Sequence, residues 1–217
     1  MRNIVIALLF IMSSMGGGSV YAQDPHELSI EEKNQLKARI VDKLDDFQFF
    51  LGEMADKKNS QQVRTSAHQS NTLLFIGKCE PYTVTNISTG ALENKEAVKM
   101  ETSSISNGYE RRKSQTMKQY FTNILNNRAY SNIKIEQSKA VRVDNIRKVG
   151  EGKYEAIAHI HQYFAGYGGE MGVIYSDHTE KAVKIIIDRY EVSTSLGVDI
   201  IYEIKLGDMK VSLTERL

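Results

Sequence analysis

Residues 29–58 read SIEEKNQLKARIVDKLDDFQFFLGEMADKK, and this stretch decides how the fold begins. Apolar residues recur in it at steps of three and four: Leu36, Ile40, Leu44, Phe47, Leu51 and Met54. That spacing predicts one long helix with a single buried face. Ser29, followed three residues later by Glu32, forms a capping-box pattern that marks the start of the helix.

Two more helices are predicted in the first half of the chain. The second begins after Asn59 or Ser60, and Gly77 supplies the left-handed backbone that stops it. Its expected core-facing positions are Val63, Ala67, Leu74 and Phe75. The third covers about residues 114–127, where apolar and aromatic side chains again share one side.

The remaining sequence is typical of strands and turns. Residues 84–94 are rich in Thr, Asn, Ser and Gly and are expected to form a loop or an irregular edge, whereas alternation at residues 98–103 predicts a short strand. Four long strands are predicted at residues 133–143, 154–164, 181–192 and 198–211. The expected separators are residues 149–152, 166–172 and 193–197. Helices followed by antiparallel strands indicate the α+β class, with helices packed on one face of the sheet.

This order of elements, over about residues 29–212, resembles the cone-shaped fold of the nuclear-transport-factor-2-like superfamily. The segments 74–78 (LFIGK), 120–121 (YF) and 163–167 (YFAGY) are also similar to a group of secreted bacterial proteins of unknown function. The resemblance implies a strongly curved, mainly antiparallel sheet that wraps a long N-terminal helix, with a cavity between them.

Composition indicates an ordinary globular protein. Of 217 residues, 41% are hydrophobic and 25% are charged, and only two are proline, which excludes collagen-like and wholly disordered chains. Lys and Arg total 28 against 27 Asp and Glu, so nothing in the charge favours nucleic acid as a partner. The one dense basic patch, Arg111, Arg112, Lys113 and Lys118, is expected at the start of the third helix, where it forms a solvated face or a modest anion contact.

The N-terminus has the pattern of a signal peptide. Arg2 precedes an apolar run at residues 4–12, a small-residue stretch and Ala22, so residues 1–22 are predicted to be removed on export. The run is too short to span a membrane, which needs about 20 apolar residues. We therefore expect residues 23–217 to form a single domain in the periplasm, outside the cell or on its surface.

His159 and His161 form the first candidate site. Their alternation in a strand places both imidazoles on one face, about 7 Å apart, a spacing that can present two nitrogens to one metal ion. No third ligand can be identified from spacing, and the same residues fit an ordinary polar sheet face with Glu155, Ile157 and Tyr163. We predict no metal and no cofactor.

An acid/base enzyme is the alternative function. The resemblance implies it, because ketosteroid isomerases and dehydratases of that superfamily place Asp, His or Tyr side chains inside the cone. His159, His161, Asp188 and Tyr190 lie on predicted strands that could line such a cone. No residue of this chain matches a catalytic motif of the family.

Tyrosines suggest a binding role instead. Tyr163, Tyr167 and Tyr175 surround a glycine-rich hairpin and Tyr82 follows Pro81, and exposed tyrosine offers a large contact area with a polar group. We predict a noncatalytic binding or interaction module for an unknown small molecule, glycan, peptide or partner protein, with a homodimer through the sheet face as one arrangement. The candidate ligand-binding residues are His159, His161, Tyr163, Tyr167, Tyr175 and Tyr82.

Overall fold

The computed structural model describes residues 27–86, 89–137, 141–195 and 197–217. The predicted signal peptide lies outside these residues. Within them, no helix is both long and apolar enough to cross a membrane.

Three helices form the first layer of the fold. They are α1 (Ile30–Ala55), α2 (Gln61–Leu74) and α3 (Met117–Leu125), and a short 3-10 helix, η1 (Ile76–Cys79), follows α2. The predicted capping box is present in α1, where the Ser29 side chain accepts the Glu32 backbone N–H and the Glu32 carboxylate accepts the Ser29 N–H. All six apolar residues of the predicted helical stripe in α1 are buried.

The second layer is an eight-stranded mixed sheet, and the strands are joined in the order β4-β3-β10-β9-β8-β5, with β6 and β7 also paired to β8. Its strands are β3 (Lys99–Ser106), β4 (Tyr109–Thr116), β5 (Asn132–Gln137), β6 (Arg142–Val143), β7 (Arg147–Gly150), β8 (Lys153–Tyr167), β9 (Val173–Thr194) and β10 (Gly197–Arg216). All pairs are antiparallel except β3 with β10. A separate hairpin joins β1 (Tyr82–Thr85) and β2 (Leu92–Lys95).

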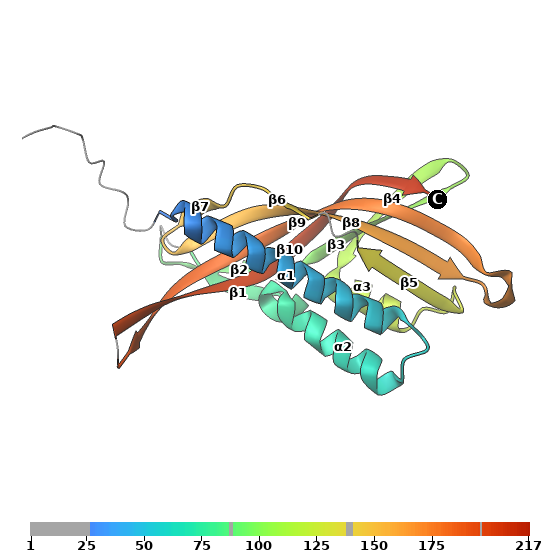
Figure 1. Ribbon diagram of the computed structural model, residues 1–217, viewed down its shortest axis with the longest axis horizontal. Coiled ribbons are helices and arrows are strands. Elements are labelled where there is room, and N and C mark those ends of the chain that lie inside the picture. Colours follow the sequence, from blue (N-terminus) through green and yellow to red (C-terminus); the bar gives the residue numbers. More distant parts are fainter. Residues whose placement is uncertain (1–26, 87–88, 138–140, 196) are drawn as a thin grey trace, which may run out of the picture.

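The long strands arch over the helices (Figure 1), and the core lies between the two layers. Phe75 stands at its centre, with its ring edge-on to Phe47 of α1 at 5.6 Å and to Phe121 of α3 at 5.8 Å between ring centroids. All three rings are fully buried. The architecture confirms the predicted α+β class, with helices on a mostly antiparallel sheet, and agrees with the cone arrangement that the resemblance implied.

Several local expectations need correction. Residues 84–85 and 92–94, expected in a loop or an irregular edge, belong to the paired strands β1 and β2. The third helix begins at Met117, because residues 109–116 pair with β3 as the polar strand β4 after a turn at Asn107 and Gly108, both with positive φ. Val63 is 43% exposed and does not face the core.

The basic patch is also placed differently. Arg111, Arg112 and Lys113 lie on β4, which forms the edge of the sheet, and only Lys118 lies on α3. Charged side chains on an edge strand discourage pairing with a second sheet.

Candidate functional site

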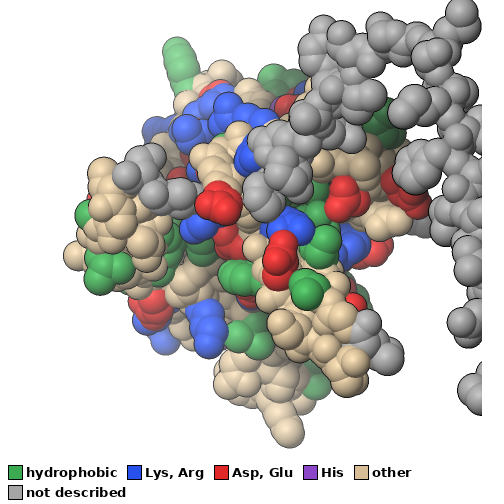
Figure 2. Space-filling view, turned by 90° about the vertical axis from the view of Figure 1, so that its left-hand side faces the viewer, with side chains coloured by type: hydrophobic (Ala, Val, Ile, Leu, Met, Phe, Trp, Pro, Cys, Tyr) green, Lys and Arg blue, Asp and Glu red, His purple; other side chains and the backbone are tan. Residues whose placement is uncertain are grey.

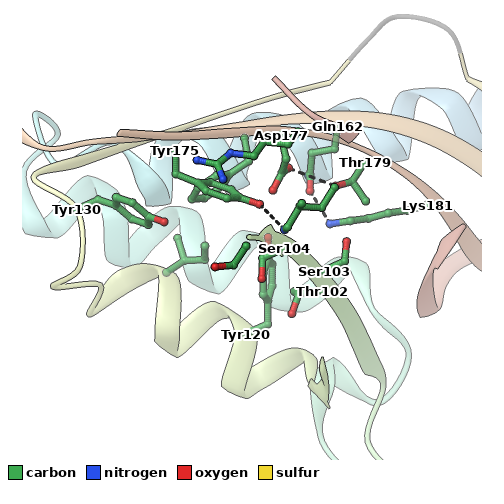
Figure 3. A pocket seen from close by; sticks show the side chains of 15 residues that line it. Thr102, Ser103, Ser104, Tyr120, Tyr130, Gln162, Tyr175, Asp177, Thr179 and Lys181 are labelled. Atoms are coloured by element: carbon green, nitrogen blue, oxygen red, sulfur yellow. Dashed lines mark hydrogen bonds between the residues drawn. The ribbon is translucent and has the colours of Figure 1, made fainter. Parts of the chain in front are cut away.

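A polar cavity with a volume of about 440 Å³ lies between the inner face of the sheet and α3 (Figure 3). Its walls come from β3, β8, β9, β10, α3 and the segment that follows α3. They are lined by Thr102, Ser103, Ser104, Ile105, Ser106, Tyr120, Ile124, Tyr130, Gln162, Phe164, Tyr175, Asp177, Thr179, Lys181 and Arg216. The volume falls in the range of about 300–1,000 Å³ that is common for small-molecule sites.

Strand β9 sends three polar side chains into this pocket. Asp177, Thr179 and Lys181 alternate with outward residues, so all three face inward, in line with the apolar Val183 and Ile185 farther along the strand. Each of the three is only 5% exposed. One strand therefore carries both an acid and a base into a buried position.

Lys181 is held by a chain of amide side chains. Its Nζ donates to Gln162 Oε1 on β8 at 2.6 Å, and Gln162 Nε2 donates to Gln48 Oε1 on α1 at 3.0 Å. Removal from water disfavours the charged amine and lowers the pKa of Lys181 to about 8, although the Asp177 carboxylate partly opposes this shift.

Asp177 shows the opposite effect of burial. Desolvation raises the pKa of its carboxyl group, and hydrogen bonds with Tyr175 and Thr179 and the field of Lys181 only partly offset that rise. The Thr179 hydroxyl donates to Asp177 Oδ1 at 3.3 Å. The acid and the base thus both have pKa values displaced toward neutrality.

Aromatic rings form the other end of the pocket. Phe164 lies edge-on to Tyr130 at 5.7 Å and to Tyr175 at 6.0 Å between centroids. The Arg216 guanidinium lies 5.6 Å from the centroid of the Tyr175 ring. The Tyr175 hydroxyl accepts the Ile105 N–H at 3.1 Å, and burial raises the pKa of this phenol to about 12, so it stays neutral. Figure 3 shows Tyr130 and Lys181 toward opposite ends of the cavity.

The sequence-predicted histidines lie on the other face of the sheet. Ala158, Ile160 and Gln162 point inward, so His159 and His161 point outward, and the expectation that they could line the cone is wrong. His159 Nε2 lies 3.1 Å from Asp144 Oδ2, and His161 Nδ1 lies 3.2 Å from His178 Nε2. No group of three His, Cys, Asp or Glu side chains among the described residues has the arrangement of a metal site.

Asp188 and Tyr190, which lie on a strand that was expected to be able to line the cone, also point away from it. They have the same parity in β9 as the outward residues, and Tyr190 is 48% exposed. The Asp188 carboxylate lies 3.8 Å from Lys153 Nζ. Neither residue lines the inner pocket, so this expectation is wrong as well.

The candidate tyrosines do not form one group. Tyr175 alone lines the inner pocket, whereas Tyr163 stacks on His178 at 4.6 Å on the outer face. Tyr167 ends β8, where its carbonyl accepts the Ser131 N–H, and Tyr82 on β1 lines a separate groove with Lys184. The structure brings Tyr163, His161 and His178 together and leaves the other candidates apart.

Sequence reasoning missed Gln162, Asp177 and Lys181 as site residues. The sequence did contain a signal for them. Val183, Ile185 and Ile187 are every second residue of β9 and face inward, and the same alternation extended toward the N-terminus places Lys181, Thr179 and Asp177 on the inner face. The predicted strand began at residue 181, so the polar first half of β9 was not recognised as part of a sheet face.

The stability of the protein is expected to depend on pH through Lys181. Between pH 8 and the ordinary lysine pKa of 10.5, the unfolded chain binds this proton and the folded chain does not, so stability rises with pH. The free energy of unfolding of the wild type, minus that of Lys181→Met, should therefore increase by on the order of 2–3 kcal/mol from pH 7 to pH 10. Urea denaturation at each pH measures it, and a difference that stays flat or falls would contradict the burial of a charged lysine.

Comparisons with known proteins give little further detail. No family model and no curated protein matches the chain. Among solved structures, the crystal structure of a "Putative Scytalone Dehydratase" from Novosphingobium aromaticivorans is similar, with a TM-score of 0.42 and 9% sequence identity over 87% of this chain and 92% of that one.

Proposed function

We propose that this protein is a noncatalytic binding module that holds a small organic molecule in the inner pocket. The observation that carries the proposal is the cavity of about 440 Å³ with aromatic rings at one end and buried polar groups at the other. Ligand sites typically combine apolar walls with a few polar groups that fix orientation.

Export is part of the proposal. It is supported by the signal-peptide pattern of residues 1–22. The near-neutral charge favours a small ligand over a polyanion, and Figure 2 shows Lys and Arg side chains interspersed with Asp and Glu on the face viewed there.

A pocket-filling variant tests the binding role. The chain has no tryptophan, and Ser104 lines the pocket from β3 at an exposed position, so Ser104→Trp adds bulk there without opening the core. The probe is N-phenyl-1-naphthylamine, an uncharged dye whose fluorescence increases in apolar sites. We expect saturable binding to the wild type and at least a tenfold weaker affinity in Ser104→Trp.

Ser114→Trp is the matched control, because Ser114 is exposed on β4 and does not line the pocket. Its affinity should stay within twofold of the wild type. If Ser104→Trp binds the dye as tightly as the wild type does, the dye binds elsewhere and the proposal fails.

An acid/base enzyme is the second candidate. Lys181 and Asp177 favour it, because both are buried, both face the cavity, and their pKa values are shifted toward the pH at which proton transfer is efficient. A bound compound that mass spectrometry recovers unchanged after long incubation indicates binding alone, whereas a converted compound indicates an enzyme.

A further inference from the structure

We infer that the ligand of the inner pocket is an organic carboxylate whose anionic group binds at Lys181 and whose apolar body lies along the aromatic end. This inference rests on the proposed binding function and adds the chemical class of the ligand. It depends on three observations: the charges of the pocket, the lack of a carboxylate in contact with Lys181 among the described residues, and the order of polar and aromatic groups along the cavity.

Lys181 lacks an anionic partner at contact distance. Its ammonium donates to the neutral Gln162 amide and, among the described residues, makes no ion pair with a carboxylate. A buried charge without a partner is costly, and an anionic ligand would supply the missing partner. An ammonium has three donors, so at least one remains for a ligand in the cavity that Lys181 lines.

The charges around the pocket favour an anion. Asp177 is the one acid among the lining residues, and it is opposed by Lys181 and by Arg216, which is its direct partner in the β9–β10 register. The pocket therefore carries one net positive charge when all three groups are ionised. A monocarboxylate brings that charge to zero, whereas an amine would double the number of uncompensated cations.

The order of groups suits an amphipathic acid. Lys181 lies toward one end in Figure 3, and Tyr130 lies toward the other, beside Phe164. Ring faces and edges there accept an apolar or aromatic body. The tyrosine hydroxyls of the pocket stay neutral, since burial raises the pKa of Tyr120, Tyr130 and Tyr175, and so they do not repel an anion.

The pH dependence of binding follows from the titratable groups that line the pocket with Lys181. The lining includes Asp177 on the same strand, Gln162 on β8, Ser103 on β3, Tyr120 on α3 and, at Tyr175, Arg216 on β10. As pH rises, Asp177 gains negative charge and Lys181 loses its positive charge, and both changes weaken the binding of an anion. Affinity for a carboxylate should therefore fall as pH rises from 6.5 to 9, while affinity for an uncharged ligand should not.

Three matched probes test the inference by isothermal titration calorimetry on the purified protein. They are 4-phenylbutyrate, 4-phenylbutyramide and 4-phenylbutylamine, which share one body and differ in the charge of the head group. We expect the carboxylate to bind at least tenfold more tightly than the amide at pH 7, and the amine to bind most weakly. The preference for the carboxylate over the amide should shrink at least threefold at pH 9.

Variants assign the anion to Lys181. Lys181→Met should remove the preference for the carboxylate, and Thr102→Asp, at a half-buried position of the pocket wall on β3, should reduce carboxylate affinity at least tenfold by adding a negative charge. Thr102→Asp keeps the test decisive if the lysine variant does not fold. Arg216→Gln removes the second cation of the lining, which is exposed and lies at Tyr175, and should weaken carboxylate binding less than Lys181→Met does. Lys210→Gln is the control, because this exposed lysine of β10 does not line the pocket, and it should change the affinity less than threefold.

The outcomes separate the two proposals. Equal binding of the carboxylate and the amide, or a preference for the carboxylate that survives in Lys181→Met and is lost in Arg216→Gln, overturns the inference and leaves the binding function intact. If none of the three probes binds and N-phenyl-1-naphthylamine does not bind either, the proposed function and the inference fail together.

Discussion

The variant Phe75→Ala is expected to lower the free energy of unfolding by about 3–5 kcal/mol, the usual cost of truncating a fully buried phenylalanine. Phe75 is 0% exposed, and its ring contacts Phe47 of α1 and Phe121 of α3 edge-on. Its backbone also forms a bridge with Leu206 of β10. One side chain thus joins two helices where the chain meets the sheet, and its removal leaves a cavity that no neighbour can fill without moving an element.

Urea denaturation followed by circular dichroism measures this loss. Phe49→Ala is the matched control, because Phe49 belongs to α1 but is 63% exposed and contacts only Phe50 among the aromatic rings described. Its cost should stay below about 1 kcal/mol. Similar losses in the two variants would mean that the three-ring contact does not organise the core.

The sequence predicted the parts of the fold that bury a continuous apolar face. The helix α1 was predictable because Leu36, Ile40 and Leu44 repeat with the helical period and Ser29 caps the start. The strand β8 was predictable because Ala156, Ala158 and Ile160 alternate with polar residues. In both elements the apolar residues recur with the period of the secondary structure because one face is buried, so the sequence pattern agrees with the tertiary structure.

Elements without a buried face were not predictable in the same way. The strand β4, YERRKSQT, has no apolar alternation, and it exists because β3 offers a free edge after a two-residue turn at Asn107 and Gly108. An Asn-Gly pair is a strong hairpin signal, but the polar residues that follow it hide the strand. This segment is a strand because its backbone pairs with β3, and not because its side chains are buried.

The pocket was hidden for a related reason. Asp177 and Lys181, which give the pocket its acid and its base, occupy inward positions of β9. Inward positions of a strand are normally expected to hold apolar side chains. His159 and His161 were chosen as candidates because of their residue type, but side chains alternate between the two faces along β8, and these two lie on the outer face. Assigning them correctly requires knowing which face of the sheet the helices cover, and this is a property of the tertiary structure.

The second large effect is expected for Arg64→Met, with a loss of about 2–4 kcal/mol in the free energy of unfolding. Arg64 lies on α2 and is 8% exposed. Its Nε donates to the Met54 carbonyl at 2.9 Å and its Nη2 donates to the Leu125 carbonyl at 2.7 Å. These carbonyls belong to the last turns of α1 and α3, where no intrahelical donor remains and a positive charge is favourable.

Methionine fills similar space but leaves both carbonyls without this donor, so the expected cost is that of unpaired polar groups and not of a cavity. Arg39→Met is the matched control, since the exposed Arg39 also donates to a backbone carbonyl, that of Tyr202, at 2.7 Å, and water can replace it there. Its loss should stay below about 1 kcal/mol. Arg64→Lys should lie between, because an ammonium lacks the fork that reaches two helix ends at once. If Arg64→Met costs no more than Arg39→Met, the three helices are held by their apolar contacts alone, and α3, which forms one wall of the pocket, does not depend on Arg64 for its position.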